Sequence, residues 1–309
     1  MRGSALLLVA ALGVVSCTDA LPPSGPTAPP GSEAPPRSAL PTPTPPRPSP
    51  APALLPDPDA PIPASSSRLA GDLVAVTGAL QDSIEQWTSL GHPSQGRPPR
   101  AVVLQALYQQ RIYGTIARDP SLRSRVLALL PRALRGPAEA NATAGAKLLS
   151  VVSSAGHPGQ VRVGPPPPAG KLRGWCQRAE ARFGVDWELL AAVMFVESRF
   201  GRLRSASGAG AQGPMQFLSS TWAAYGLGGD VHDPRDAIMG AANYLRASGA
   251  PQRERHALYR YNPTWAYVDA IEAYANQMRG DPVNFYAYYN WQVFVVTDNG
   301  PVRLTGPGA

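Results

Sequence analysis

The run from Asp186 to Gly201, DWELLAAVMFVESRFG, constrains the fold most, because it predicts one helix with a single acid among apolar residues near its end. Asp186 can cap the first turn, since its side-chain oxygen can accept an orphan backbone N–H. Gly201 can close the last turn in the left-handed conformation that other residues resist. Three- and four-residue spacing places four residues on one face, namely Leu190, Val193, Met194 and Glu197. The acid therefore ends an apolar stripe.

Glu197 is a candidate proton donor. Withdrawal from water raises the pKa of a carboxyl group, because the charged form loses more solvation than the neutral form. Such a group can be protonated near neutral pH and can donate its proton to a leaving group. The alternative is that Glu197 is only the wet edge of an amphipathic helix, since acids are rarely fully buried.

Three segments downstream give the acid a context. Residues 207–217, SGAGAQGPMQF, are too glycine-rich for helix or strand, so their backbone can approach a ligand closely. Asp233 and Pro234 then begin a helix, and Tyr261 precedes Asn262. In this order, together with the ESRFG motif from Glu197, they resemble the lysozyme-like lytic transglycosylases, closest to the membrane-bound B type. The resemblance covers roughly residues 170 to 280.

The resemblance implies the residues of the site. Glu197 is implied as the catalytic acid and base for the MurNAc to GlcNAc linkage of peptidoglycan. The positions implied to contact substrate are Ser207, Met215, Gln216, Tyr244, Tyr261 and Asn262. Gln216 could hydrogen-bond the acetamido group of the sugar or the acid itself, and Met215 would form an apolar wall. Tyr244 could equally be a core residue, whose hydroxyl would then need a partner.

A second catalytic carboxylate is not apparent. Most glycosidases use two, with substrate assistance as a recognised exception, and here Asp233 and Asp236 suit the cap and first turn of a helix. The family implies that the 2-acetamido group replaces the second acid, and that Glu197 then closes a 1,6-anhydro ring. Two alternatives stay open: a hydrolytic muramidase of the same fold, and a cell-wall-binding lipoprotein without turnover.

The first residues predict export. Arg2, an apolar stretch over residues 5–15 and the small Ser16 describe a secretory signal peptide over residues 1–16. Cys17 follows directly, which resembles a bacterial lipoprotein signal whose cysteine is acylated. We expect an extracytoplasmic protein, lipid-anchored to the membrane and facing the cell wall. An ordinary signal with an incidental cysteine is the alternative.

Composition divides the rest of the chain. Residues 17–67 are a Pro-rich segment predicted to be a disordered linker, residues 68–163 a helical bundle of unknown role, and residues 164–170 a Pro hinge. Residues 171–284 form the predicted catalytic domain, and residues 285–309 a β-hairpin and tail. Helices are expected over 122–134 and 137–152. These helices predict a fold that is mainly α, and the resemblance implies that residues 171–284 are a lysozyme-like α+β domain.

Several classes of ligand are disfavoured. The formal charge is +7, but the basic residues are scattered and no nucleic-acid motif accompanies them. The four histidines lie far apart, and the segment 226–230 is too short and acid-poor for a calcium loop, so no metal and no cofactor are expected. Cys176, on an apolar helical face, is expected to be a buried free thiol. Peptidoglycan strands are the expected partner, and the sequence indicates no particular protein partner. Four aromatic residues near the end, Tyr286, Tyr288, Tyr289 and Trp291, could stack on sugars or pack the hairpin.

Overall fold

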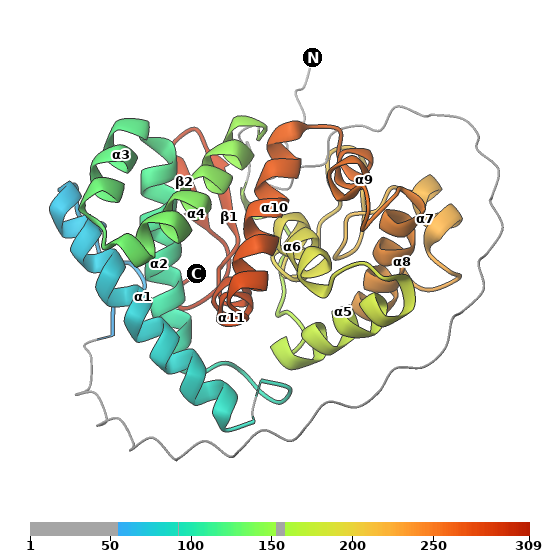
Figure 1. The fold of residues 1–309 in the computed structure, drawn as a ribbon, viewed down its shortest axis with the longest axis horizontal. Coiled ribbons are helices and arrows are strands. Elements are labelled where there is room, and N and C mark those ends of the chain that lie inside the picture. Colours follow the sequence, from blue (N-terminus) through green and yellow to red (C-terminus); the bar gives the residue numbers. More distant parts are fainter. Residues whose placement is uncertain (1–54, 92, 153–157) are drawn as a thin grey trace, which may run out of the picture. The chain divides into compact units, whose positions relative to one another are not determined.

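Helix α6 lies at the centre of the part of the chain that the structure describes (Figure 1). The structure is a computed structural model, and it describes residues 55–91, 93–152 and 158–309. The predicted signal peptide, Cys17 and most of the predicted linker lie outside the described residues. The elements in chain order are α1 (Ser66–Ser89), α2 (Arg100–Arg118), α3 (Pro120–Leu129), α4 (Arg132–Ser150), a 3-10 turn (Pro158–Gln160), α5 (Ala169–Phe183), α6 (Trp187–Ser198), α7 (Ser219–Tyr225), α8 (Pro234–Ala247), α9 (Glu254–Tyr261), α10 (Trp265–Gly280), α11 (Val283–Tyr289), β1 (Phe294–Thr297) and β2 (Gly300–Arg303).

Helices α1 to α4 confirm the expected helical bundle. The buried residues of α1 recur every three or four positions, which is why this helix packs along one face against α2 and α3. The Asp119 carboxylate caps α3 by accepting from the Leu122 N–H at 2.8 Å, as the Asp-Pro pair predicts. The break between α3 and α4 falls at Pro131, so the expected bounds of 122–134 and 137–152 are wrong. Pro137 lies inside α4, where the sequence predicted a start.

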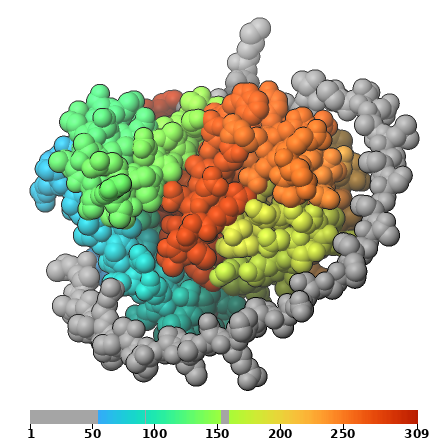
Figure 2. Space-filling model, viewed as in Figure 1, coloured from blue at the N-terminus to red at the C-terminus, as the bar shows by residue number. Residues whose placement is uncertain are grey.

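Helix α10 joins the bundle to the rest of the described chain. It packs against α4 on one side and α6 on the other, and Figure 2 shows it at the surface between α4 and the region of α5 and α9. Lys147 of α4 pairs with Asp269 of α10. The buried Tyr288 hydroxyl donates to Asn141 Oδ1 at 2.7 Å. Residues 68–163 and 171–284 therefore share contacts through one core, and their division into two domains stays a prediction.

Helices α5 to α9 belong to the predicted catalytic domain, in which α5 and α8 pack against α6. Asp233 caps α8 as predicted, because its Oδ1 accepts from the N–H groups of Arg235 and Asp236 at 2.8 and 3.1 Å. Gly226 ends α7 as predicted, and a Cβ there would lie 2.4 Å from the Trp222 ring. Cys176 is buried in α5 and is a free thiol, as expected.

The predicted Pro hinge is tied to its neighbours. The Gly164 N–H donates to the Arg202 carbonyl at 2.8 Å. Further along, the Pro167 carbonyl accepts from the Tyr289 hydroxyl at 2.9 Å. These contacts fix the extended segment against residues that follow α6 and against α11.

The C-terminal segment corrects one prediction. The residues from Val283 to Tyr289 form helix α11, and only the hairpin of β1 and β2, with Thr297 opposite Gly300, has the predicted strand structure. A short aromatic run satisfies both a helical and an alternating pattern, so periodicity could not separate them. The four aromatic residues Tyr286, Tyr288, Tyr289 and Trp291 are 8, 1, 3 and 4% exposed. They pack the core, and the sugar-stacking interpretation is wrong.

Gln110 of α2 makes the most specific contact between the bundle and the C-terminal segment. Its Nε2 donates to the Gln292 carbonyl at 2.9 Å, and its Oε1 accepts from the Gln292 N–H at 2.7 Å. Gln110→Leu leaves both buried backbone groups unpaired, so we expect the free energy of unfolding to fall by about 2 to 4 kcal/mol in urea titrations.

Gln81→Leu is the matched control, because within the described residues this exposed amide bonds only Glu85 at the surface. We expect it to change stability by less than about 0.5 kcal/mol. Equal effects of the two substitutions would contradict the importance of the buried Gln110 pair.

Candidate functional site

Helix α6 withdraws Glu197 from water. Apart from Glu188, which is half-buried, every residue of α6 is buried, and Glu197 is 2% exposed. The acid therefore does not lie on the wet edge of an amphipathic helix. The helix is covered on all sides, whereas the sequence predicted an apolar stripe.

The ends of α6 differ in detail from the sequence prediction. Asp186 precedes the helix but makes no side-chain cap, and its carboxylate pairs instead with Arg279 of α10 at 2.9 Å. At the other end, the left-handed backbone begins at Arg199 and continues through Phe200 to Gly201, with φ of 51°, 58° and 79°. Gly201 thus has the predicted conformation, but it is the last of three such residues. Non-glycine residues in this region are strained, so the chain turns sharply just after Glu197.

A hydroxyl group holds one oxygen of the acid. The Tyr267 hydroxyl, fully buried on α10, donates to Glu197 Oε1 at 2.8 Å. Burial raises the pKa of Glu197 to about 8, and the hydrogen bond from Tyr267 acts in the opposite direction by favouring the charged form. The acid is therefore largely protonated at neutral pH. One oxygen is bound by Tyr267, which leaves the other for a reaction partner.

Tyr267 was not predicted from the sequence as a residue of the site. Its signal was its position on the buried face of α10, together with Ile271 and Tyr274 at helical spacing. A phenol on such a face must find a hydrogen-bond partner, and an acid predicted to be buried is one. The helical spacing of these residues was therefore enough to predict Tyr267 as a candidate partner of Glu197.

Tyr261 lies close enough to Glu197 for the charge of the carboxylate to shift the pKa of its hydroxyl. Burial first, and then the negative charge of Glu197, hold the pKa of Tyr261 well above its ordinary value, and the same causes raise the pKa of Tyr267. The Tyr261 hydroxyl donates to the Met215 carbonyl at 2.6 Å. Tyr244 meets the Tyr261 ring edge-on at 5.5 Å and donates its hydroxyl to the Arg260 carbonyl at 2.6 Å. Tyr244 thus has the partner that a core tyrosine needs.

Residues 212–217 form a tight turn beside α6. Gln212 and Phe217 exchange two backbone hydrogen bonds of 2.8 and 2.9 Å across it. Gly213 has φ of 74°, and a Cβ there would lie 1.9 Å from the Val231 carbonyl oxygen, so only glycine fits. The close backbone approach predicted for these glycines is, at Gly213, an approach to the protein's own chain.

Ser198 connects this turn to the acid helix. Its hydroxyl donates to the Pro214 carbonyl at 2.5 Å and accepts from the Gly201 N–H at 2.8 Å. The residue after Glu197 therefore fixes both the turn and the end of α6. Ser198 belongs to the ESRFG motif, but its role in positioning was not predicted from the sequence.

Gln216 presents an unusual amide. Its backbone is left-handed with φ of 50°, and its Nε2 donates to the Gly213 carbonyl at 2.9 Å. Its Oε1 is buried and has no hydrogen-bond partner in the described part of the chain. A buried polar oxygen of this kind requires an explanation, because leaving it unpaired costs about 1 to 3 kcal/mol. Strain in the backbone and an unpaired oxygen at one residue are frequent at functional sites.

The remaining predicted residues have structural partners. The Ser207 Oγ accepts from the Ala211 N–H at 3.0 Å, which closes the turn over residues 207–211. The Met215 side chain is fully buried in the hydrophobic core. Asn262, 2% exposed, follows α9, and its Oδ1 accepts from the Thr264 hydroxyl at 3.3 Å. The contacts thus join Tyr267 to Glu197 and Tyr261 to Met215 directly, whereas Ser207 bonds within its own loop.

The described residues hold neither a cluster of metal-ligating side chains nor a helix suited to span a membrane. No three of the His, Cys, Asp and Glu side chains in residues 55–91, 93–152 and 158–309 gather as metal ligands would. Within the same residues, no helix has the length and apolar character to span a bilayer.

Comparisons with known proteins match the same segment. Residues 175–277 match the family model described as the transglycosylase SLT domain. The chain is 32% identical over 119 residues to a membrane-bound lytic murein transglycosylase F of Thiobacillus denitrificans, which is 36% of this chain and 25% of the relative. The transglycosylase F 1 of Alkalilimnicola ehrlichii is 29% identical over 120 residues, 36% of this chain and 24% of the relative. No solved structure matches the chain.

These matches define what is shared and what is not. The similar segment spans only about a quarter of the length of these relatives. Their names are those of the F type, whereas the sequence resemblance was closest to the B type. The resemblance to lytic transglycosylases is thus confirmed over the matched segment, and the subtype of the similar proteins differs. The match contains Glu197, Tyr261 and Tyr267.

The pKa of Glu197 has a consequence for stability that can be measured. Its folded pKa, about 8, exceeds its unfolded value of about 4.3. The folded state therefore keeps a proton that the unfolded chain releases, so the stabilising contribution is complete below about pH 4 and is lost as pH rises toward 8. Glu197→Gln cannot titrate. We therefore expect the difference in free energy of unfolding, variant minus wild type, to increase by up to about 1.4 kcal/mol per pH unit between pH 5 and pH 8. Urea titrations at each pH measure it. A difference that stays constant with pH would contradict the burial of the acid.

Proposed function

On the premise that residues 175–277 are a transglycosylase SLT domain, we propose that this protein is a lytic transglycosylase that cleaves the MurNAc to GlcNAc linkage of peptidoglycan. The observation that carries the proposal is the buried acid. Glu197 holds its proton at neutral pH because burial raises its pKa to about 8, and general-acid cleavage of a glycosidic bond needs such a proton.

The first step uses the protonated acid. Tyr267 holds Oε1, so the proton is delivered from Oε2 to the glycosidic oxygen. The bond between C1 of MurNAc and that oxygen breaks, and its electron pair stays on the leaving GlcNAc oxygen. The carbonyl oxygen of the 2-acetamido group bonds to C1 and takes the place of a second carboxylate. The Tyr267 hydroxyl then stabilises the carboxylate that remains on Glu197.

The second step uses the carboxylate. Glu197 takes the proton of the 6-hydroxyl group, the hydroxyl oxygen bonds to C1, and the acetamido oxygen leaves. The product is a 1,6-anhydro-MurNAc end, and the acid has regained its proton. A raised pKa serves both steps, because the group must release and recover a proton near neutral pH.

The amide of Gln216 is the best candidate for contact with the sugar. Its buried Oε1 can accept from the N–H of the acetamido group, and its Nε2 is already held by Gly213. Met215, Tyr244, Tyr261 and Asn262 then shape the wall around the acid, while Ser207 closes the loop beyond it. The contacts of Tyr244 and Met215 support positioning roles at least as well as direct contact.

Product analysis tests this function. Glu197→Gln should abolish release of 1,6-anhydro muropeptides from purified cell wall, as read by mass spectrometry, because the amide cannot donate the proton. Glu188→Gln is the matched control, since Glu188 lies in the first turn of the same helix, and it should release them at the wild-type rate.

The other outcomes separate the rival functions. Products with a reducing end would show a hydrolytic muramidase of the same fold. Binding of cell wall by both the wild type and Glu197→Gln without cleavage by either would show a non-catalytic cell-wall-binding lipoprotein. Unchanged anhydro release by Glu197→Gln would reject the acid.

We also propose that the protein is exported and anchored by lipid on Cys17. Its spacer would be residues 17–54 of the Pro-rich segment and not the predicted 17–67, because the Pro58 and Ala60 carbonyls accept from Arg111 and α1 begins at Ser66. The similar proteins are named membrane-bound, and the sequence around Cys17 supports acylation. Cys17→Ser should move the protein from the membrane fraction of its host to the soluble extracytoplasmic fraction. Retention in the membrane would exclude the anchor.

A further inference from the structure

A cavity of about 300 Å³ lies between the helical bundle and the helices that hold Glu197. Its volume falls at the lower end of the range for ligand pockets. Residues of α2 and α4 line one part of it, and the other part is lined by Val196 and Arg199 at the end of α6, Tyr274 of α10, and Trp291. Among the described residues, its lining does not include Glu197 or any other carboxylate. The proposed catalytic function leaves this cavity without a role.

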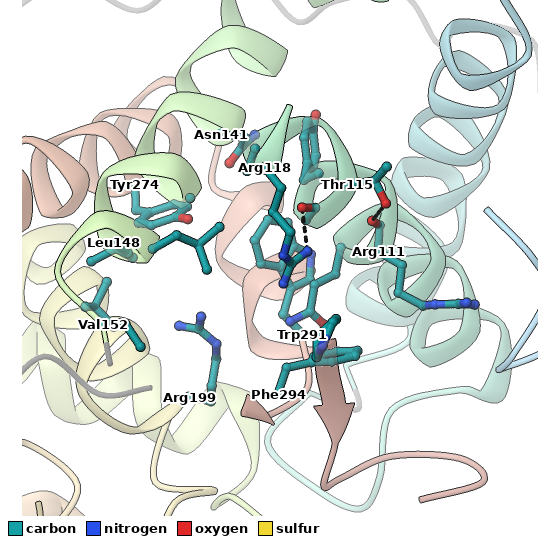
Figure 3. A pocket seen from close by; sticks show the side chains of 18 of the residues that line it. Arg111, Thr115, Arg118, Asn141, Leu148, Val152, Arg199, Tyr274, Trp291 and Phe294 are labelled. Atoms are coloured by element: carbon teal, nitrogen blue, oxygen red, sulfur yellow. Dashed lines mark hydrogen bonds between the residues drawn. The ribbon is translucent and has the colours of Figure 1, made fainter. Parts of the chain in front are cut away.

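Two guanidinium groups point into the cavity. Figure 3 shows Arg118 of α2 and Arg199 extending toward the same space, whereas Arg111 points away from it. Arg111 is already engaged, since its Nη1 donates to the carbonyls of Pro58 and Ala60. Arg118 and Arg199 are therefore the charges that a ligand would meet.

Neither of these arginines has an acidic partner among the described residues. Each donates one hydrogen bond to the backbone carbonyl four residues earlier, from Arg118 Nη1 to Gly114 at 2.6 Å and from Arg199 Nη1 to Phe195 at 2.8 Å. Removal from water lowers the pKa of both groups. A guanidinium carries five N–H donors in a fork that suits carboxylate and phosphate oxygens, so most of its donors stay available here.

Apolar and aromatic side chains make up much of the remaining lining of the cavity, to which Gln110, Thr115 and Asn141 add polar groups. Leu148, Val152, Tyr274, Trp291 and Phe294 line it around the two charges (Figure 3). Such a surface favours the burial of an apolar or aromatic body. The cavity thus combines cationic donors with an apolar wall.

We propose that this cavity binds a small organic anion, with its carboxylate or equivalent acidic head between Arg118 and Arg199 and its apolar body against the aromatic wall. Arg199 lies half-buried, and Arg118 is exposed at the edge of the cavity. Arg199 should therefore contribute more to binding, because charge-assisted hydrogen bonds weaken in contact with water.

Fluorescence titration with two matched dyes tests the proposal on the purified protein. The probe is 8-anilinonaphthalene-1-sulfonate, and its control is N-phenyl-1-naphthylamine, which has the same rings and lacks the anion. We expect the anionic dye to saturate one site and to be displaced by decanoate. Arg199→Gln should lower the affinity for the anionic dye at least about ten-fold, and Arg118→Gln should lower it about five-fold. The neutral dye should bind both variants as it binds the wild type, which also shows that the cavity is intact.

Two further variants complete the design. Arg125→Gln removes an exposed arginine of α3 outside the cavity, and it should leave the binding of both dyes unchanged. Leu149→Trp fills the cavity from a half-buried position in its lining, and it should abolish the binding of both. The proposal is overturned if the anionic dye fails to saturate, if decanoate does not displace it, or if its affinity is the same in Arg199→Gln as in Arg125→Gln.

Discussion

The hydrogen bond between the Tyr267 hydroxyl and the buried carboxyl of Glu197 is the interaction on which the site depends. A carboxyl group that is 2% exposed loses most of its solvation, and its pKa rises to about 8 as a result. Tyr267 offsets part of this cost at one oxygen and fixes the direction of the other. Burial outweighs the effect of this hydrogen bond on the pKa, so Glu197 keeps its proton at neutral pH.

This hydrogen bond requires the fold to hold α6 and α10 in fixed positions relative to each other. Helix α10 carries Tyr267, and it packs against α6 on one side and α4 on the other. The bundle of α1 to α4 therefore packs against the helices that carry the site. Buried contacts such as that between Tyr288 and Asn141 hold the two together. The same arrangement leaves the cavity with Arg118 and Arg199 between the bundle and the end of α6. A ligand in that cavity would touch both helices that position the acid.

Local signals in the sequence predicted much of this structure. The Asp-Pro pairs at Asp119 and Asp233 predicted two helix starts correctly, because a cap is set by neighbouring residues. The predictions that were wrong concern residues whose contacts lie far away in the sequence. The Asp186 carboxylate pairs with Arg279, far along the chain, in place of capping its own helix, and the aromatic run of α11 became helical because its rings pack the core. Tyr267 could be recognised as a partner of Glu197 only once α6 and α10 were placed side by side.

Direct titration of Glu197 tests the central claim most directly. Infrared spectra of the wild type, with those of Glu197→Gln subtracted at each pH, isolate the carbonyl band of this one protonated carboxyl group. A desolvated acid held by Tyr267 should lose that band with a midpoint near pH 8. Tyr267→Phe should move the midpoint higher, because the hydrogen bond favours the charged form. A midpoint near 4.5, the ordinary value for a glutamic acid, would contradict the account.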